Sequence, residues 1–196
     1  MKFKNWKKDG FVILSIITAI SVFTLQSCKN NPKADSENDV ISEQKNLNEI
    51  VSEEDIESLF LLKDNSDFSI ALHQILVNRH DKNPDSLNQI QWNLFLCMHL
   101  ENAGQSETIL TFLEEWFPDQ REQVIISLTE IGAVKSAESI KLAVTLLPKD
   151  GSSFFDNPTE NSDRFMMTLN SLFINYPDGP MPDLYRKYAE KHRDEI

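Results

Sequence analysis

Apolar residues recur at helical spacing from about residue 52 to the end of the chain, and no stretch of useful length alternates like a β-strand. Ile140, Ala143, Val144 and Leu147 follow the i, i+3, i+4, i+7 spacing that gathers apolar side chains on one helix face. The same spacing predicts further helices over Ile56–Phe60, Phe68–Asp81, Val124–Ile131, Phe165–Tyr176 and Asp183–Arg193. The pattern predicts a compact all-α bundle of about seven to eight helices.

The densest apolar stretch runs from Ser86 to Pro118. Its first helix carries apolar residues on two faces, which predicts burial on most sides. Ser86 and Gln89 fit a capping box at its start, and Gly104 fits a left-handed C-cap at its end. A second helix should end at Pro118, because proline cannot continue the hydrogen-bond ladder. We expect the other helices to pack around this hairpin.

The N-terminus has the layout of a targeting segment. Four lysines precede an apolar run of 15 residues, Phe11–Leu25, which is shorter than the ~20 residues that span a bilayer. The run ends in Leu25-Gln26-Ser27-Cys28, which resembles the lipobox of bacterial lipoproteins. The resemblance implies cleavage before Cys28 and attachment of acyl chains to it, and two or more chains hold a protein stably at a membrane. An uncleaved membrane anchor is the alternative.

These features predict a signal peptide over residues 1–27 and a lipid-anchored protein of the cell envelope. Lys29 is not the aspartate that retains lipoproteins at the inner membrane in enteric-type sorting, so we expect the outer membrane where one exists. Residues 28–51 are polar and lack a sustained period, which is typical of a flexible tether behind the anchor. A short helix around Glu43–Val51 is the alternative for the end of this segment. A single helical domain should then cover residues 52–196, with Ser52 and Asp55 capping its first helix.

The chain is acidic, with 19 basic and 31 acidic residues and a formal charge of −12. Removing residues 1–27 takes away four lysines and one aspartate, and leaves 15 basic and 30 acidic residues, a formal charge of −15. This balance argues against direct nucleic-acid binding, which requires basic residues to neutralise phosphates. It fits a basic protein as partner.

Three short motifs from Leu87 onward resemble a widespread bacterial domain named after the DNA-mimic protein family. They are Glu101-Asn102-Ala103-Gly104, Glu130-Ile131-Gly132-Ala133 and Tyr176-Pro177-Asp178. The resemblance covers roughly residues 86–196 and implies an all-α fold. For some members it also implies an acidic surface that imitates the DNA backbone and occupies a DNA-binding protein.

The sequence holds no constellation typical of an enzyme or of a cofactor site. The histidines lack the tight spacing of a zinc site, which needs three or four converging ligands, and no phosphate-binding glycine motif occurs. We therefore expect no catalytic residue, metal or cofactor, and a domain that is monomeric. The residues predicted to bind a partner flank the central turn and the Pro118 turn: Glu101, Asn102, Gly104, Glu107, Glu114, Glu115, Asp119 and Glu122. The leading hypothesis is an acidic interaction module, and the alternative is a DNA mimic.

Overall fold

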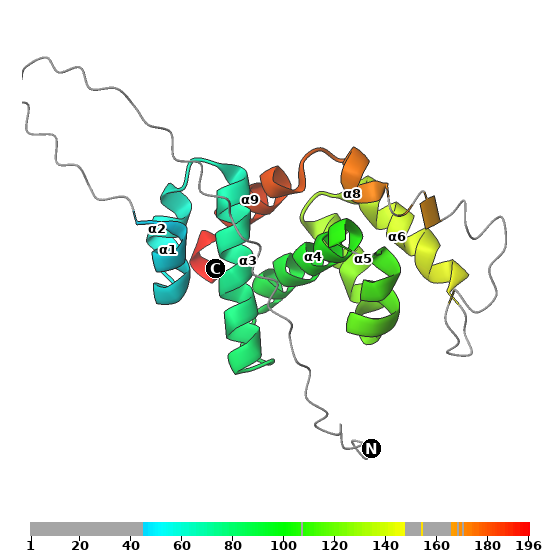
Figure 1. Ribbon diagram of the computed structural model, residues 1–196, viewed down its shortest axis with the longest axis horizontal. Helices are drawn as coiled ribbons and strands as arrows, with labels where there is room; N and C mark the ends of the chain where they lie inside the picture. The colour runs from blue at the N-terminus through cyan, green and yellow to red at the C-terminus, as the bar shows by residue number, and fades with distance from the viewer. Residues whose placement is uncertain (1–44, 107, 148–153, 155–165, 168, 170) are drawn as a thin grey trace, which may run out of the picture. The chain divides into compact units, whose positions relative to one another are not determined.

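The computed structural model describes residues 45–106, 108–147, 154, 166–167, 169 and 171–196. Within these ranges the chain forms helices and no strand, so the prediction of an all-α fold is confirmed (Figure 1). The predicted signal peptide, Cys28 and most of the predicted tether lie outside the described residues. Most of the loop predicted over residues 148–159 lies outside them as well.

The central helix is α4, which covers Gln89–Ser106. It contacts α3 (Asn65–Lys82), α5 (Arg121–Glu130) and α8 (Leu172–Asn175). Five consecutive side chains of α4, from Leu94 to Met98, are buried, which a helix with one apolar face would not show. The prediction that this helix is covered on most sides is confirmed, and Figure 1 shows it between α3 and α5.

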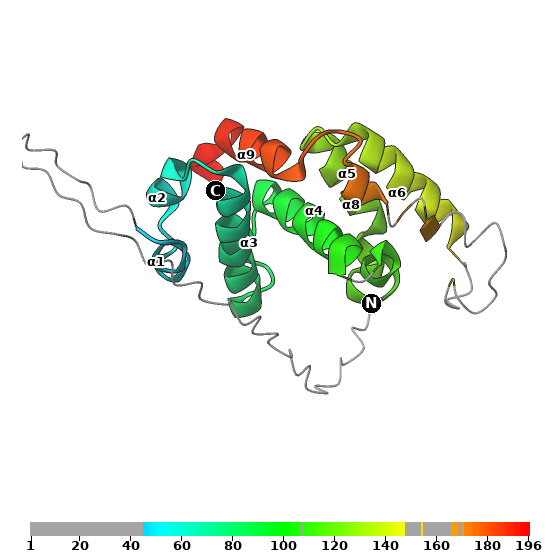
Figure 2. The ribbon, with the colours of Figure 1, turned by 45° about the horizontal axis from the view of Figure 1, so that its top comes forward.

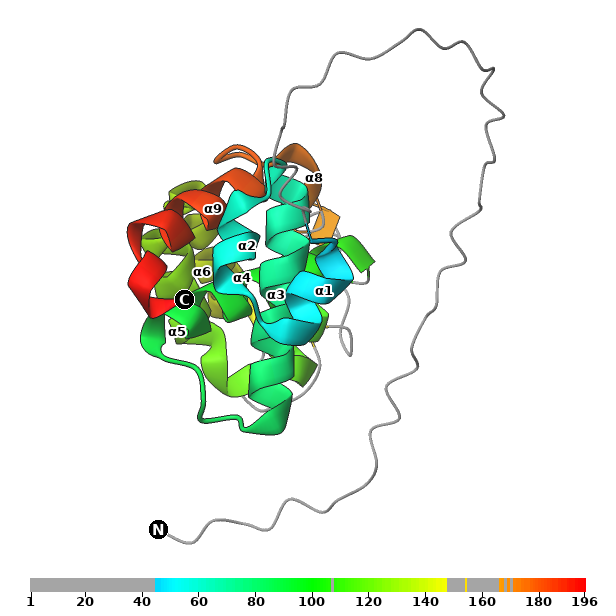
Figure 3. The same ribbon diagram turned by 90° about the vertical axis from the view of Figure 1, so that its left-hand side faces the viewer.

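Helix α3 is the second organising element. It packs against α1 (Leu47–Glu53), α2 (Ile56–Leu61) and α9 (Met181–Lys191). Figure 3 shows α1 and α2 lying in front of α3, and Figure 2 shows α9 crossing above the upper ends of α3 and α4. The apolar core is continuous through these contacts, because Phe68, Leu72, Ile75 and Leu76 of α3 are fully buried. Helix α9, near the end of the chain, thus packs against α3, the first long helix.

The start of the domain differs from the sequence-based prediction. Ser52 lies inside α1 and donates its hydroxyl to the Glu49 carbonyl, whereas Asn46 is the N-cap and forms a capping box with Glu49. Helix α1 therefore begins before residue 52, within the segment predicted as tether. Its burial of Ile50 against the core explains why so short a helix is stable.

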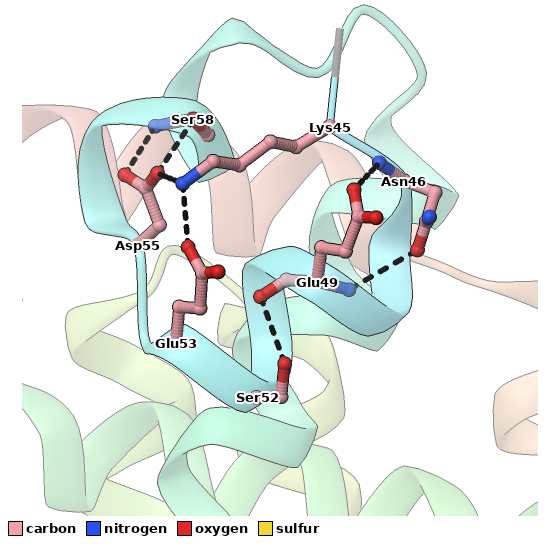
Figure 4. Close-up of polar contacts among 7 residues, drawn as sticks. All are labelled: Lys45, Asn46, Glu49, Ser52, Glu53, Asp55 and Ser58. Atoms are coloured by element: carbon pink, nitrogen blue, oxygen red, sulfur yellow. Dashed lines mark hydrogen bonds and ion pairs between the residues drawn. The ribbon is translucent and has the colours of Figure 1, made fainter.

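Polar contacts hold α1 and α2 together at this end of the domain (Figure 4). Asp55 caps α2 by accepting from the Ser58 backbone N–H at 3.0 Å. The Lys45 ammonium lies 2.6 Å from a carboxylate oxygen of Asp55 and 2.6 Å from one of Glu53. The hydrogen bond from Lys45 holds the pKa of Asp55 below its ordinary value, with the Ser58 hydrogen bonds acting in the same direction. The point at which the chain enters the domain is thereby fixed.

Helix α4 begins two residues later than the predicted capping box implies. Asn88, not Ser86, accepts from the Gln91 N–H, and Gln91 accepts from the Asn88 N–H in return. Ser86 instead donates its hydroxyl to the Arg79 carbonyl at the end of α3. The chemistry of a capping box is present, but Asn88 and Gln91 supply it.

The segment after α4 also differs in detail. A π-helical turn, η1, covers Thr111–Trp116, and Pro118 begins the short 3₁₀ helix η2 (Pro118–Gln120) that leads into α5. Pro118 thus stands at the first position of a helix, where its missing N–H costs nothing. Helix α5 then forms a hairpin with α6 (Val134–Leu146). Gly132, at φ +92°, makes the turn between them, as the sequence predicts.

In the part of the chain that the structure describes, no helix combines the length and the apolar character that crossing a bilayer requires.

Candidate interaction surface

Glu101 is not part of an exposed acidic face, and this corrects the sequence-based prediction. Its side chain is buried on α4. Oε2 accepts from the Tyr185 hydroxyl at 2.9 Å, and Oε1 accepts from the Tyr176 hydroxyl at 3.0 Å and from Gln105 Nε2 at 3.1 Å. Burial raises the pKa of Glu101, while the hydrogen bonds from the two tyrosines act in the opposite direction. Glu101 therefore joins α4 to α9 and to the turn after α8.

The Tyr176-Pro177-Asp178 turn, like Glu101, links separate elements of the fold. Tyr176 adopts a left-handed conformation with φ 44° and reaches Glu101. Asp178 accepts from the backbone N–H groups of Lys135 and Ser136 at 2.9 and 2.8 Å. Helix α6 has no cap of its own, so Asp178 satisfies its free N–H groups from a distant part of the chain. Both motif residues hold the fold together.

Asn102 and Gly104 do not form a turn that lines a groove. Helix α4 continues through both positions to Ser106. A Cβ on Gly104 would lie 2.6 Å from Cδ2 of Phe173, so glycine is needed there for close packing against α8. Asn102 is exposed, and its Nδ2 lies 3.4 Å from Nδ1 of His73 on α3. Glu107 lies outside the described residues.

The remaining predicted acids lie around Pro118, and they are not equivalent. Glu114 accepts from the Phe154 backbone N–H at 2.9 Å, so it is already engaged. Glu115, Asp119 and Glu122 are exposed, and none of them forms an ion pair with a described residue. We name residues 115–122 the Pro118 corner.

Two further residues define the character of the Pro118 corner. Trp116 keeps 37% of its surface exposed, which is unusual for a side chain of this size. Arg121, the one base in this segment, donates from Nε to the Leu113 carbonyl at 2.7 Å. Three exposed acids thus lie beside one exposed aromatic ring, and the acids outnumber the base.

Many acids elsewhere in the described residues are neutralised by ion pairs. Glu54 binds Arg79 and Lys82, Asp55 and Glu53 bind Lys45, Glu57 binds Arg193, and Glu190 binds Arg186. These pairs lie on α1 to α3 and on α9 and its C-terminal extension. Asp67, Glu130 and Glu138 are also exposed and form no ion pair among the described residues. The Pro118 corner differs from them because its three acids are grouped within eight residues that include Trp116.

A pair of histidines joins α3 to α4. His73 Nε2 lies 3.2 Å from His99 Nδ1, which also lies 3.0 Å from the Phe95 carbonyl oxygen. Burial lowers the pKa of His73 to about 3, and the neighbouring His99 acts in the same direction. Burial likewise lowers the pKa of His99 to about 4. Both rings are therefore neutral near pH 7, and the Nδ1–H of His99 donates to the Phe95 carbonyl.

The spacing of the histidines along the chain does not predict this contact. Among the described residues, no group of three or more histidine, cysteine, aspartate or glutamate side chains converges as metal ligands would. The signal that reveals the pair is helical register: His73 shares a face of α3 with Leu72 and Leu76, and His99 follows Phe95 by one turn.

Residues 85–192 match the family model of the DMP19-like proteins. The match covers more than half of the 196 residues. The chain belongs to the DMP19-like family. The matched segment begins just before α4 and includes Glu101, Tyr176 and Asp178, so the links described above lie within the part that resembles the family. Helices α1 to α3 precede the match, and α3 packs against α4 and α9 within it. No curated protein and no solved structure matched the chain.

Proposed function

We propose that this DMP19-like domain is held at the bacterial cell envelope by acyl chains on Cys28, and that its Pro118 corner binds a basic protein. The protein acts by binding, without catalysis and without a cofactor. The observation that carries the proposal is the corner itself, where Glu115, Asp119 and Glu122 are exposed and unpaired among the described residues beside Trp116.

The composition of the corner fits this role physically. Exposed carboxylates attract a basic surface from solution and orient its approach. A tryptophan with an exposed ring supplies the apolar contact that commonly dominates the binding energy of an interface. Carboxylates already held in ion pairs, as on α1 to α3, would have to give up their partners first.

A DNA mimic is the second candidate function, and membership in the DMP19-like family favours it. In that case the basic partner is a DNA-binding protein, and the exposed acids stand in for phosphates. Displacement separates the two candidates. Duplex DNA would compete with the domain for a mimicked partner, and would leave another basic partner bound.

The anchor is tested by metabolic labelling with a fatty acid. Wild-type protein should take up the label and appear in the membrane fraction, and C28A should remain an unlabelled precursor. Equal labelling of C28A would contradict acylation at this residue. C97A is the matched control, because Cys97 is fully buried in α4.

The interaction is tested by affinity capture from envelope extracts with the full chain in detergent. A corner variant, E115K/D119K/E122K, should lose the basic proteins that the wild type captures. A control variant, D67K/E130K/E138K, makes the same change of charge at exposed positions outside the corner and should keep them. Identical protein sets for all three would overturn the proposed role of the corner.

A further inference from the structure

A pocket of about 450 Å³ lies between the end of α3 and the start of α4, next to the Pro118 corner. His80 lines it from α3, Asp85 from the connection between the helices, Trp92 from α4, and Gln120 from η2. Gln120 belongs to the corner, so the pocket and the unpaired acids share one border.

The pocket offers an aromatic wall. Trp92 lies 5.2 Å from Phe95 and 5.8 Å from His80, measured between ring centroids, with nearly parallel planes. Phe95 is almost fully buried and contacts both other rings, whereas Trp92 and His80 are partly exposed. A planar cation is attracted to such aromatic surface, and tryptophan attracts it most.

Three polar side chains of the pocket have no partner among the described residues, whereas the lining residue Gln89 donates to Asn93 Oδ1 at 2.9 Å. The carboxylate of Asp85, the indole N–H of Trp92 and the amide of Gln120 make no hydrogen bond or ion pair with any residue that the structure describes. A carboxylate can accept two hydrogen bonds from a guanidinium. The indole N–H and the amide suit the carbonyl and N–H groups of a peptide backbone.

The charges around the pocket favour a cation. Asp81 and Asp119 adjoin the lining residues His80 and Gln120 in the chain, and Arg79 and Arg121 adjoin them on the other side. Arg79 is held by Glu54 at 3.0 Å, and Arg121 donates to the Leu113 carbonyl. The nearby base Lys82 is held by Glu54, at 2.8 Å. The partial negative charge at the end of α3 and the partial positive charge at the start of α4 oppose each other here. Among the residues that line the pocket, Asp85 is the one carboxylate, and its negative charge favours a cation there.

We propose that this pocket binds an arginine side chain from a basic peptide segment of the partner. The guanidinium pairs with Asp85 and lies against Trp92, and Gln120 contacts the peptide backbone. Arginine fits better than lysine, because its planar group pairs bidentately with a carboxylate and stacks on aromatic rings. The inference rests on the proposed function, because it names where a basic partner inserts beside the Pro118 corner.

The test uses the full chain in detergent micelles with ¹⁵N-labelled tryptophan. The two indole signals of the processed chain, from Trp92 and Trp116, are assigned with W92F and W116F variants. The probe is the peptide acetyl-Gly-Arg-Gly-amide, and the control is the same peptide with citrulline, which has the shape of arginine without its charge. The arginine peptide should shift the Trp92 signal to saturation, and the citrulline peptide should leave it nearly unchanged.

D85N should weaken binding of the arginine peptide by about two- to fivefold, as expected for loss of one exposed ion pair. D67N, at an exposed aspartate on α3, should leave the affinity unchanged. Equal shifts with both peptides, or equal affinity for D85N and wild type, would overturn the inference. If the pocket binds arginine while the corner variant captures every partner, the proposed function fails and the pocket stands. If the corner is required for capture but the pocket ignores arginine, only the pocket inference fails.

Discussion

The hydroxyl of Tyr185 lies 2.9 Å from Oε2 of Glu101, and both side chains are buried between α9 and α4. This contact gives a hydrogen-bond donor to a carboxylate that lies inside the domain and not on its surface. Replacing Tyr185 with phenylalanine leaves Oε2 buried without that donor, so Y185F should lower the free energy of unfolding by about 1–3 kcal/mol. Urea denaturation measures this. Y176F is the control and should cost less, because Tyr176 is partly exposed.

The His73–His99 pair should make stability depend on pH. The pKa values of about 3 and about 4 in the folded protein lie below the value of 6.5 for unfolded histidine, so the unfolded chain binds more protons below pH 6.5. Stability should therefore fall as the pH drops from 6.5 toward 4, by up to about 2.7 kcal/mol per pH unit when both rings contribute. Two charged groups lie near the pair: His80 lowers the pKa of His99, and Asp81 raises it.

Thermal unfolding across this pH range checks that dependence. H73Q/H99Q should flatten the slope between pH 6.5 and 4. H80Q, which alters a histidine next to the pair, controls for the loss of an imidazole from the same region. A double variant with the wild-type slope would show that the pair does not titrate as its burial implies.

Leu94 is fully buried at the centre of α4, and its removal should leave a cavity. L94A should cost ~2–5 kcal/mol of unfolding free energy. Leu142 on α6 is 55% exposed and provides the matched control, since L142A at such a site should change stability by less than about 0.5 kcal/mol. Similar losses for the two variants would contradict the central position of α4.

Asp178 provides the cap of α6 from the far side of the chain. D178A should destabilise the domain by about 0.5–2 kcal/mol, because two backbone N–H groups and the Ser136 hydroxyl lose their acceptor. D194A removes an exposed carboxylate that makes no described side-chain contact, and should be neutral. Guanidinium denaturation of the two variants distinguishes a cap from a solvated acid.

The sequence predicts the helices well because their periodicity is local. The spacing of Leu94, Cys97 and Met98 predicts a buried helix, and Gly132 indicates the turn between α5 and α6. The prediction that Gly104 ends the helix is wrong, because glycine occurs both at helix ends and where elements pack closely. Here the ring of Phe173, far along the chain, requires glycine for close packing. Local pattern cannot reveal a contact with a residue so far along the chain.

The candidate site is less predictable for the same reason. Glu101 falls on the same helix face as Leu94, Cys97 and Met98, which is the one local sign that it points inward. The tyrosines that make its burial tolerable come from the end of the chain. Glu115, Asp119 and Glu122 are exposed around the Pro118 turn. Their role in binding stays a prediction.

The most direct test of the central claim is the salt dependence of binding. With a captured partner in purified form, Kd is measured for the wild type, for E115K/D119K/E122K and for D67K/E130K/E138K over a series of salt concentrations. Screening between exposed charges acts beyond about 8 Å at physiological ionic strength. The account predicts that wild type and control variant bind more weakly as salt rises, and that the corner variant binds weakly throughout with little salt dependence. A corner variant whose affinity and salt dependence equal those of the wild type would contradict the account.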